Sequence, residues 1–133
     1  MNKKLLTLIL ISIILSSCSA IREKNTERLY KEASAEDYDL NLTKEEDEIN
    51  QIINYCNAYS LAQSFYVTDD DSYFSLADKV LYYKMADIDK YNEVVNLKNS
   101  CYESYNITDE DIKKVTKKRT AKIEKLKKKL EKE

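Results

Sequence analysis

The sequence predicts an all-α protein: a small up-down-up bundle of three to four helices with a basic C-terminal helix, stapled by a disulfide. Three observations support this expectation. The 133 residues include neither Gly nor Pro, which tight turns and breaks in a chain usually need. Apolar residues recur at three- and four-residue spacing over long segments, which is typical of helices with one buried face. The third observation is a pair of cysteines in the body of the chain.

The N-terminus has the pattern of a secretory signal. Lys3 and Lys4 precede an apolar run from Leu5 to Leu15, and small residues follow it. The run of about eleven residues is shorter than the roughly twenty that a transmembrane helix needs. An uncleaved anchor or a buried core helix is the alternative interpretation.

Leu15-Ser16-Ser17-Cys18 resembles the bacterial lipobox, in which an apolar residue and two small residues precede the modified cysteine. The resemblance implies lipidation of the Cys18 thiol, cleavage before Cys18 and acylation of the new amino terminus, with chains such as palmitate holding the protein in a membrane. In a Gram-negative host, Ser19 resembles the pattern that is sorted to the outer membrane, facing the periplasm.

Four segments follow from this pattern. They are a signal peptide (1–17), a lipidated cysteine with a polar tether (18–42), a disulfide-linked helical bundle (43–107) and a lysine-rich C-terminal helix (108–133). Apolar positions are sparse in residues 19–42, which indicates a tether. A short helix is expected within it, around residues 22–34.

Three helices are predicted in the bundle, over about residues 44–66, 72–86 and 88–105. Thr43 and Glu46 fit a capping box, which satisfies free backbone donors where a helix begins. The second and third helices are separated only by the weak break around Asp87, so the sequence leaves open whether they are two helices or one.

Cys56 and Cys101 are expected to form the disulfide, because an even pair in an exported chain favours one. Two unpaired, buried thiols are the alternative. If residues 72–105 formed one helix folded back on 44–66, Cys56 would lie opposite roughly residue 82, far from Cys101. If 88–105 instead runs parallel to 44–66, both cysteines lie about twelve residues into their helices, at one height. The disulfide therefore favours the up-down-up arrangement.

The C-terminal helix is basic and the rest of the mature chain is acidic. Residues 19–111 hold 9 Lys and Arg against 21 Asp and Glu, whereas residues 112–133 hold 11 against 3. The apolar stripe of this helix is interrupted at Arg119 and Lys122, so only its start and end are expected to bury well. Its basic residues are candidates for contact with an anionic surface: Lys113, Lys114, Lys117, Lys118, Arg119, Lys122 and Lys125. The alternatives are that the helix folds back along the acidic body or is simply solvated.

The composition argues against an enzyme. The chain contains no His, the commonest general base and metal ligand, and no Gly for a phosphate-binding loop. No metal site, cofactor, small-molecule substrate or nucleic-acid partner is expected. The run Asp69-Asp70-Asp71 lacks the glycine turn of an EF-hand and is better explained as a helix cap.

Two further patterns bear on the surface. The 11 tyrosines suit a binding surface, although filling the core of a small bundle is the expectation for most of them. Asp39-Leu40-Asn41-Leu42-Thr43 resembles the extended bacterial N-glycosylation sequon, and whether Asn41 is glycosylated stays open.

These observations predict a non-enzymatic, lipid-anchored protein that binds another component of the envelope or a secretion machine. The expected architecture is similar to that of the pilotins, although no pilotin motif is present. One alternative is a periplasmic immunity or exclusion lipoprotein that blocks a toxin, phage or plasmid, because an acidic body would steer a basic toxin. A structural or adhesive surface lipoprotein is the other.

Overall fold

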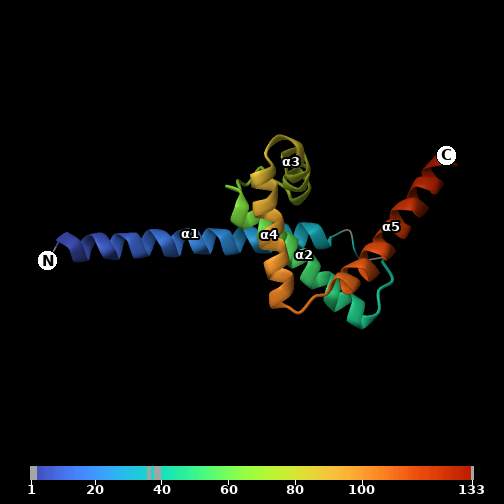
Figure 1. The fold of residues 1–133 in the computed structure, drawn as a ribbon, viewed down its shortest axis with the longest axis horizontal. Coiled ribbons are helices and arrows are strands. Elements are labelled where there is room, and N and C mark those ends of the chain that lie inside the picture. Colours follow the sequence, from blue (N-terminus) through green and yellow to red (C-terminus); the bar gives the residue numbers. More distant parts are fainter. Residues whose placement is uncertain (1–2, 36, 38–39, 133) are drawn as a thin grey trace.

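The computed structural model describes residues 3–35, 37 and 40–132, and the side chains from Ser19 onward. Within these ranges the chain forms five helices and no strand (Figure 1). They are α1 (Lys3–Ser34), α2 (Lys44–Ser64), α3 (Tyr73–Ala86), α4 (Ile88–Ser104) and α5 (Asp109–Glu131). The all-α prediction is confirmed, while the number of helices exceeds the three to four expected.

Helix starts follow local capping. Thr43, Ser72 and Thr108 each accept a backbone hydrogen bond from the residue three positions later, whose side chain binds back to the cap. These reciprocal bonds satisfy donors that the first helical turn leaves free. The Asp87 side chain accepts from the Lys90 amide (3.2 Å), so one residue ends α3 and begins α4. The two helices are therefore separate.

The segment predicted as a tether is helical over residues 22–34, as expected, but it packs on the bundle instead of standing apart from it. Helix α1 continues to Ser34 and packs extensively on α2, with Thr26, Leu29 and Ala33 buried. These residues recur at spacings of three and four, so they form one narrow stripe. Two of the three are small or polar, which is why the hydrophobic pattern does not reveal the stripe. Helix α1 thus belongs to the bundle.

Helix α2 lies at the centre of the fold and contacts each of the other four helices. One apolar cluster joins it to α1, α3 and α4 through Leu29, Ala58, Leu61, Ala62, Leu76 and Val94. A second cluster joins it to α4 and α5 through Ile53, Cys56, Cys101, Tyr102 and Val115. Each of the other four helices therefore contributes buried apolar side chains to a cluster that includes α2.

The predicted disulfide is present, with 5.5 Å between the Cα atoms of Cys56 and Cys101. The predicted direction of α4 is wrong, because α4 runs antiparallel to α2 (Figure 1). Lys90, at the start of α4, donates to the Ser64 carbonyl at the end of α2. Helix α3 packs mainly on α4 and buries only Leu76 among its described residues. The helix that runs back along α2 is therefore α4 and not α3.

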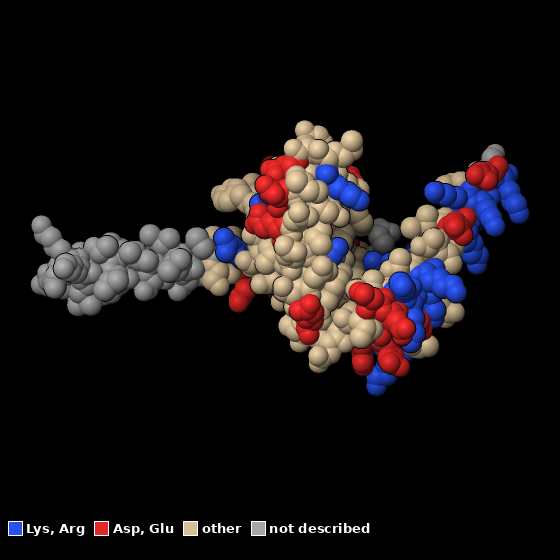
Figure 2. Space-filling model, in the orientation of Figure 1, with Lys and Arg blue, Asp and Glu red and all other residues tan. Residues whose placement is uncertain are grey.

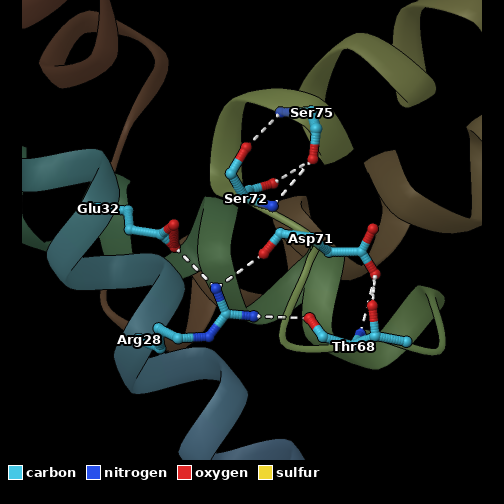
Figure 3. Close-up of polar contacts among 6 residues, drawn as sticks. All are labelled: Arg28, Glu32, Thr68, Asp71, Ser72 and Ser75. Carbon is cyan, nitrogen blue, oxygen red and sulfur yellow. Dashed lines mark hydrogen bonds and ion pairs between the residues drawn. The ribbon is translucent and has the colours of Figure 1, made fainter.

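Arg28 of α1 holds the loop between α2 and α3 (Figure 3). Its guanidinium donates to the carbonyls of Asp71 (2.8 Å) and Thr68 (3.1 Å) and pairs with Glu32 (3.1 Å). Within the loop, the Asp71 carboxylate accepts from the amide (2.9 Å) and hydroxyl (3.2 Å) of Thr68. These amide and hydroxyl bonds lower the pKa of Asp71. The cap of α3 is Ser72, so the expectation that the aspartate run caps the helix is wrong, and Asp71 instead closes the turn that begins at Thr68.

Helix α5 has a docked start and a projecting end. Val115 is buried and Ile112 is half-buried against the body, but Ile123, Leu126 and Leu130 are exposed. The expectation that the end of the apolar stripe would also bury is wrong. Figure 1 shows the reason, because α5 continues beyond the helices that support its first turns.

We expect removal of the disulfide to lower the free energy of unfolding by about 4 kcal/mol, since the bridge closes a loop across a sequence separation of 45 residues. The measurement is urea unfolding of the protein with and without reductant. Unreduced Cys56→Ser/Cys101→Ser should match the reduced wild type and should not respond to reductant. Equal stability of the oxidised and reduced wild type would contradict this account.

Candidate functional site

A cleft lined by tyrosines lies where α1, α2 and α4 meet. Three adjoining hollows of about 430, 280 and 420 Å³ share Tyr55 as a common wall. Tyr30, Tyr59 and Tyr105 complete the aromatic lining. We call these four residues and their hollows the tyrosine cleft.

Tyr55 is the centre of the cleft. Its ring meets Tyr30 and Tyr105 edge to face, with centroids 6.4 and 6.0 Å apart, and stacks with Tyr59 at 6.3 Å. Rings in such contacts hold one another in position and still present apolar faces and hydroxyl groups to a ligand. The cleft is therefore a preformed aromatic surface.

The fold assembles the cleft from three separate segments. Tyr55 and Tyr59 lie one turn apart on α2, on either side of Cys56. The disulfide brings the end of α4, and with it Tyr105, beside them. Tyr30 follows the fully buried Leu29 of α1, so the packing of α1 on α2 places its ring.

The charge around the cleft is negative. Glu23, Glu27 and Glu48 line it, and no Lys or Arg is among the described residues that do. Glu27 forms an exposed ion pair with Lys31 (3.3 Å). Partial burial raises the pKa of the Tyr55 hydroxyl, and Tyr105, Tyr59 and Glu23 add to this effect. Aromatic faces beside carboxylates favour a cationic or apolar ligand group over an anion.

Fewer described tyrosines fill the core than expected, since Tyr30, Tyr59 and Tyr73 pack against the apolar clusters while remaining partly exposed. Only Tyr102 among the described tyrosines is buried; burial and the neighbouring Tyr73 raise its pKa to about 12. Tyr55, Tyr66, Tyr82 and Tyr105 are exposed. Sequence spacing could not separate core tyrosines from surface tyrosines, because a ring at the edge of the buried face of a helix suits either position.

A second cluster joins α5 to the body through polar side chains. The Asp37 carboxylate accepts from Asn50 (2.9 Å), Asn54 (2.7 Å) and Arg119 (2.9 Å). Arg119 also donates to the side-chain oxygens of Asn50 and Asn54, the latter at 2.7 Å. We call these four residues the Arg119 cluster.

The Arg119 cluster is almost closed to solvent on its α2 side. Asn50 and Asn54 are 2% and 1% exposed, and each amide is bonded to both Asp37 and Arg119. Buried amides are costly without partners, so the cluster ties α5 and the segment after α1 to one place on α2. It contains no nucleophile and no paired acid and base. Its role is therefore to position α5.

The sequence pattern did not predict this cluster, because Arg119 was interpreted as an interruption of the apolar stripe. The available signal was the spacing of Asn50 and Asn54, which lie one turn apart on the face of α2 that also carries Ile53. A buried amide pair needs partners of opposite hydrogen-bonding type. A guanidinium and a carboxylate together provide them.

The predicted anionic-surface residues divide into two groups. Lys118 pairs with Glu46 (2.7 Å) and Arg119 pairs with Asp37, so these two residues contact the body. Lys113, Lys114, Lys117 and Lys125 are exposed, and Lys122 is half-buried. Figure 2 shows acidic side chains gathered beside the start of α5 and basic ones along its far end. The sequence left open whether the helix folds back along the acidic body or stays solvated. The first half of α5 contacts the body through Lys118 and Arg119, and the far end is mostly solvated.

Other predicted positions have simpler outcomes. Cys18 and the signal-peptide side chains lie outside those that the structure describes. Asn41 is exposed, with a φ angle of 55°, and Asp39 of its sequon is also outside the described residues. No group of three or more potential metal ligands occurs among the described residues.

The described residues contain no helix that is long and apolar enough to span a membrane. Comparison of the chain with protein-family models, with curated proteins and with solved structures finds no match. The function must therefore be argued from the tyrosine cleft, the Arg119 cluster and the sequence pattern of the N-terminus.

We expect Arg119→Met to lower the free energy of unfolding by about 2 kcal/mol, because Asn50 and Asn54 would keep buried oxygens without a donor. Thermal or urea unfolding measures this loss. Lys117→Met, at an exposed position two residues away, is the matched control and should change stability by less than about 0.5 kcal/mol. Equal effects of the two substitutions would contradict a positioning role for the cluster.

The Glu46–Lys118 pair predicts a specific pH dependence. The hydrogen bond from Lys118, with bonds from Thr43, lowers the pKa of Glu46 from 4.5 to about 2. A lowered pKa in the folded state stabilises the fold above the ordinary pKa, and the contribution is lost as the pH falls through the folded value. The stability difference between wild type and Glu46→Gln should therefore be full above pH 4.5 and vanish near pH 2.

Urea unfolding of both proteins across this pH range measures the effect. Gln can still cap the helix, so the substitution removes mainly the charge that faces Lys118. In a Lys118→Gln background the same substitution should matter less at neutral pH. A difference between wild type and Glu46→Gln that does not change with pH would contradict the assignment.

Proposed function

We propose that this chain is a non-enzymatic, lipid-anchored protein of the bacterial envelope that binds another envelope or secretion-machine component through the tyrosine cleft. The observation that carries the proposal is the set of interlocked rings around Tyr55, which lines three adjoining hollows on an acidic surface. Tyrosine is favoured in protein-binding hot spots because it presents a large, rigid, amphipathic area.

The anchor rests on the lipobox resemblance at Cys18. The side chains of α1 are described from the next residue, Ser19, onward, and the first buried one among them is Thr26. A helix rises about 1.5 Å per residue, so a lipid on Cys18 would hold the bundle within roughly 12 Å of its attachment point. Such an arrangement keeps the cleft close to the membrane and favours a partner that is itself at the membrane surface.

A periplasmic immunity or exclusion lipoprotein is the second candidate. The carboxylates of Glu23, Glu27 and Glu48 favour it, because they would attract the basic surface of an incoming protein. Complementary charge raises the rate of encounter and disfavours acidic competitors. The two candidates use the same cleft and differ in the origin of the partner.

The experiment is cross-linking of the wild-type protein in native envelopes, followed by intact-mass analysis of the isolated bait. We expect a bait that begins at acylated Cys18 and carries a captured protein partner. Tyr55→Ala and Tyr105→Ala should each weaken capture at least roughly thirtyfold, the effect of a hot-spot residue worth about 2 kcal/mol.

The matched control is Tyr66→Ala, an exposed tyrosine outside the cleft, which should capture the partner as the wild type does. Equal loss in all three variants would contradict the assignment of binding to the cleft. A bait that retains residues 1–17 without acyl chains would contradict the anchor. If the captured partner is a toxin or a protein encoded by a phage or plasmid, the immunity or exclusion function is supported over binding to an envelope component.

A further inference from the structure

Helix α3 exposes an apolar face. Phe74, Leu81 and Met85 follow one another at spacings of seven and four residues, so they lie on one side of the helix. Their side chains are between 53% and 94% exposed. Leu76, on the other side, is buried in the core. A helix that is apolar on two faces is expected to be covered on both, and no described segment of this chain covers the outer one.

The projecting end of α5 has a similar face. Ile123, Leu126 and Leu130 continue the line of the docked Val115 but are between 49% and 69% exposed. They are within the last turns of the helix, beyond the Arg119 cluster.

These two apolar faces approach each other at one groove. Phe74 of α3 and Ile123 and Leu126 of α5 line one groove of about 270 Å³, with Arg119 also in its wall. Figure 1 shows α3 and the C-terminal end of α5 on the same side of the α1 axis. We call the six residues of the two faces the apolar ridge: Phe74, Leu81, Met85, Ile123, Leu126 and Leu130.

The charge beside the α5 half of the apolar ridge is mainly positive. Residues 120–132 contain six lysines and two glutamates, and every one of these lysines except the half-buried Lys122 is exposed. The charge along α3 is mixed, because exposed Asp78 and Asp87 lie beside the exposed Lys79 and Lys84. The same lysines would repel each other if two copies paired through their α5 ends.

We propose that the apolar ridge and its lysines form a second membrane contact, which rests on an anionic phospholipid bilayer. Interfacial helices combine an exposed apolar stripe with lysines on the adjoining faces, so that the stripe enters the acyl boundary while the charges meet lipid phosphates. This contact is separate from the tyrosine cleft, and it does not require a lipid on Cys18. It would orient the bundle, whereas lipid on Cys18 alone would only tether it.

The chain contains no Trp, so a single introduced Trp reports on one position. The full-length, unlipidated chain is prepared as Met85→Trp, as Leu126→Trp and as Ala121→Trp. Ala121 is exposed and lies two residues from Ile123, about 200° around α5, which makes it the matched control. Each variant is mixed with phosphatidylglycerol or with phosphatidylcholine vesicles whose acyl chains carry bromine as a quencher.

We expect a blue shift and bromine quenching for Met85→Trp and Leu126→Trp with phosphatidylglycerol, and neither for Ala121→Trp. Lys125→Gln/Lys129→Gln in the Leu126→Trp background should reduce the quenching. Equal signals at all three positions, or no signal in phosphatidylglycerol, would overturn the proposal. Equal quenching in phosphatidylcholine would overturn its electrostatic part. A shift that grows with protein concentration without vesicles would assign the ridge to a second copy and overturn the membrane contact.

Discussion

The burial of α2 on several sides is the constraint on which the rest of the structure depends. Small residues such as Ala58, Ser60, Ala62 and Ser64 are buried along its second half, and they let neighbouring helices approach closely. A bundle of this size buries little apolar surface, so the disulfide between α2 and α4 supplies stability that its core would otherwise lack. The tyrosine cleft and the Arg119 cluster are both built against this helix.

Helix α5 shows how one segment can serve two roles. Its first half is held by Val115 in the core and by Arg119 among the amides of α2, so its direction is set by specific contacts. Its second half projects from the body and keeps its apolar stripe and all its lysines but Lys122 exposed. The polar cluster therefore fixes where the projecting half points, which a purely apolar contact would specify less strictly.

The tyrosine cleft and the apolar ridge differ in chemistry. The cleft combines tyrosine rings with Glu23 and Glu48, and the ridge combines apolar side chains without hydroxyl groups with lysines. Surfaces of opposite charge on one small bundle suit two different ligands better than one. A membrane at the ridge and a protein at the cleft would place the chain between the bilayer and its partner, in keeping with an anchor at Cys18.

The sequence by itself determined the helix starts after residue 43 and the pairing of Cys56 with Cys101. The caps depend on side chains only three residues apart, and the three predicted helices of the bundle end within two residues of the observed ones. The packing of α1, the antiparallel course of α4, the Arg119 cluster and the cleft were decided only by the tertiary structure. Their contacts join residues such as Asp37 and Arg119, 82 positions apart, whose types suit solvent as well as a core. Local patterns reveal what a segment can form, but the choice between an exposed and a buried polar or aromatic side chain depends on which distant group lies opposite.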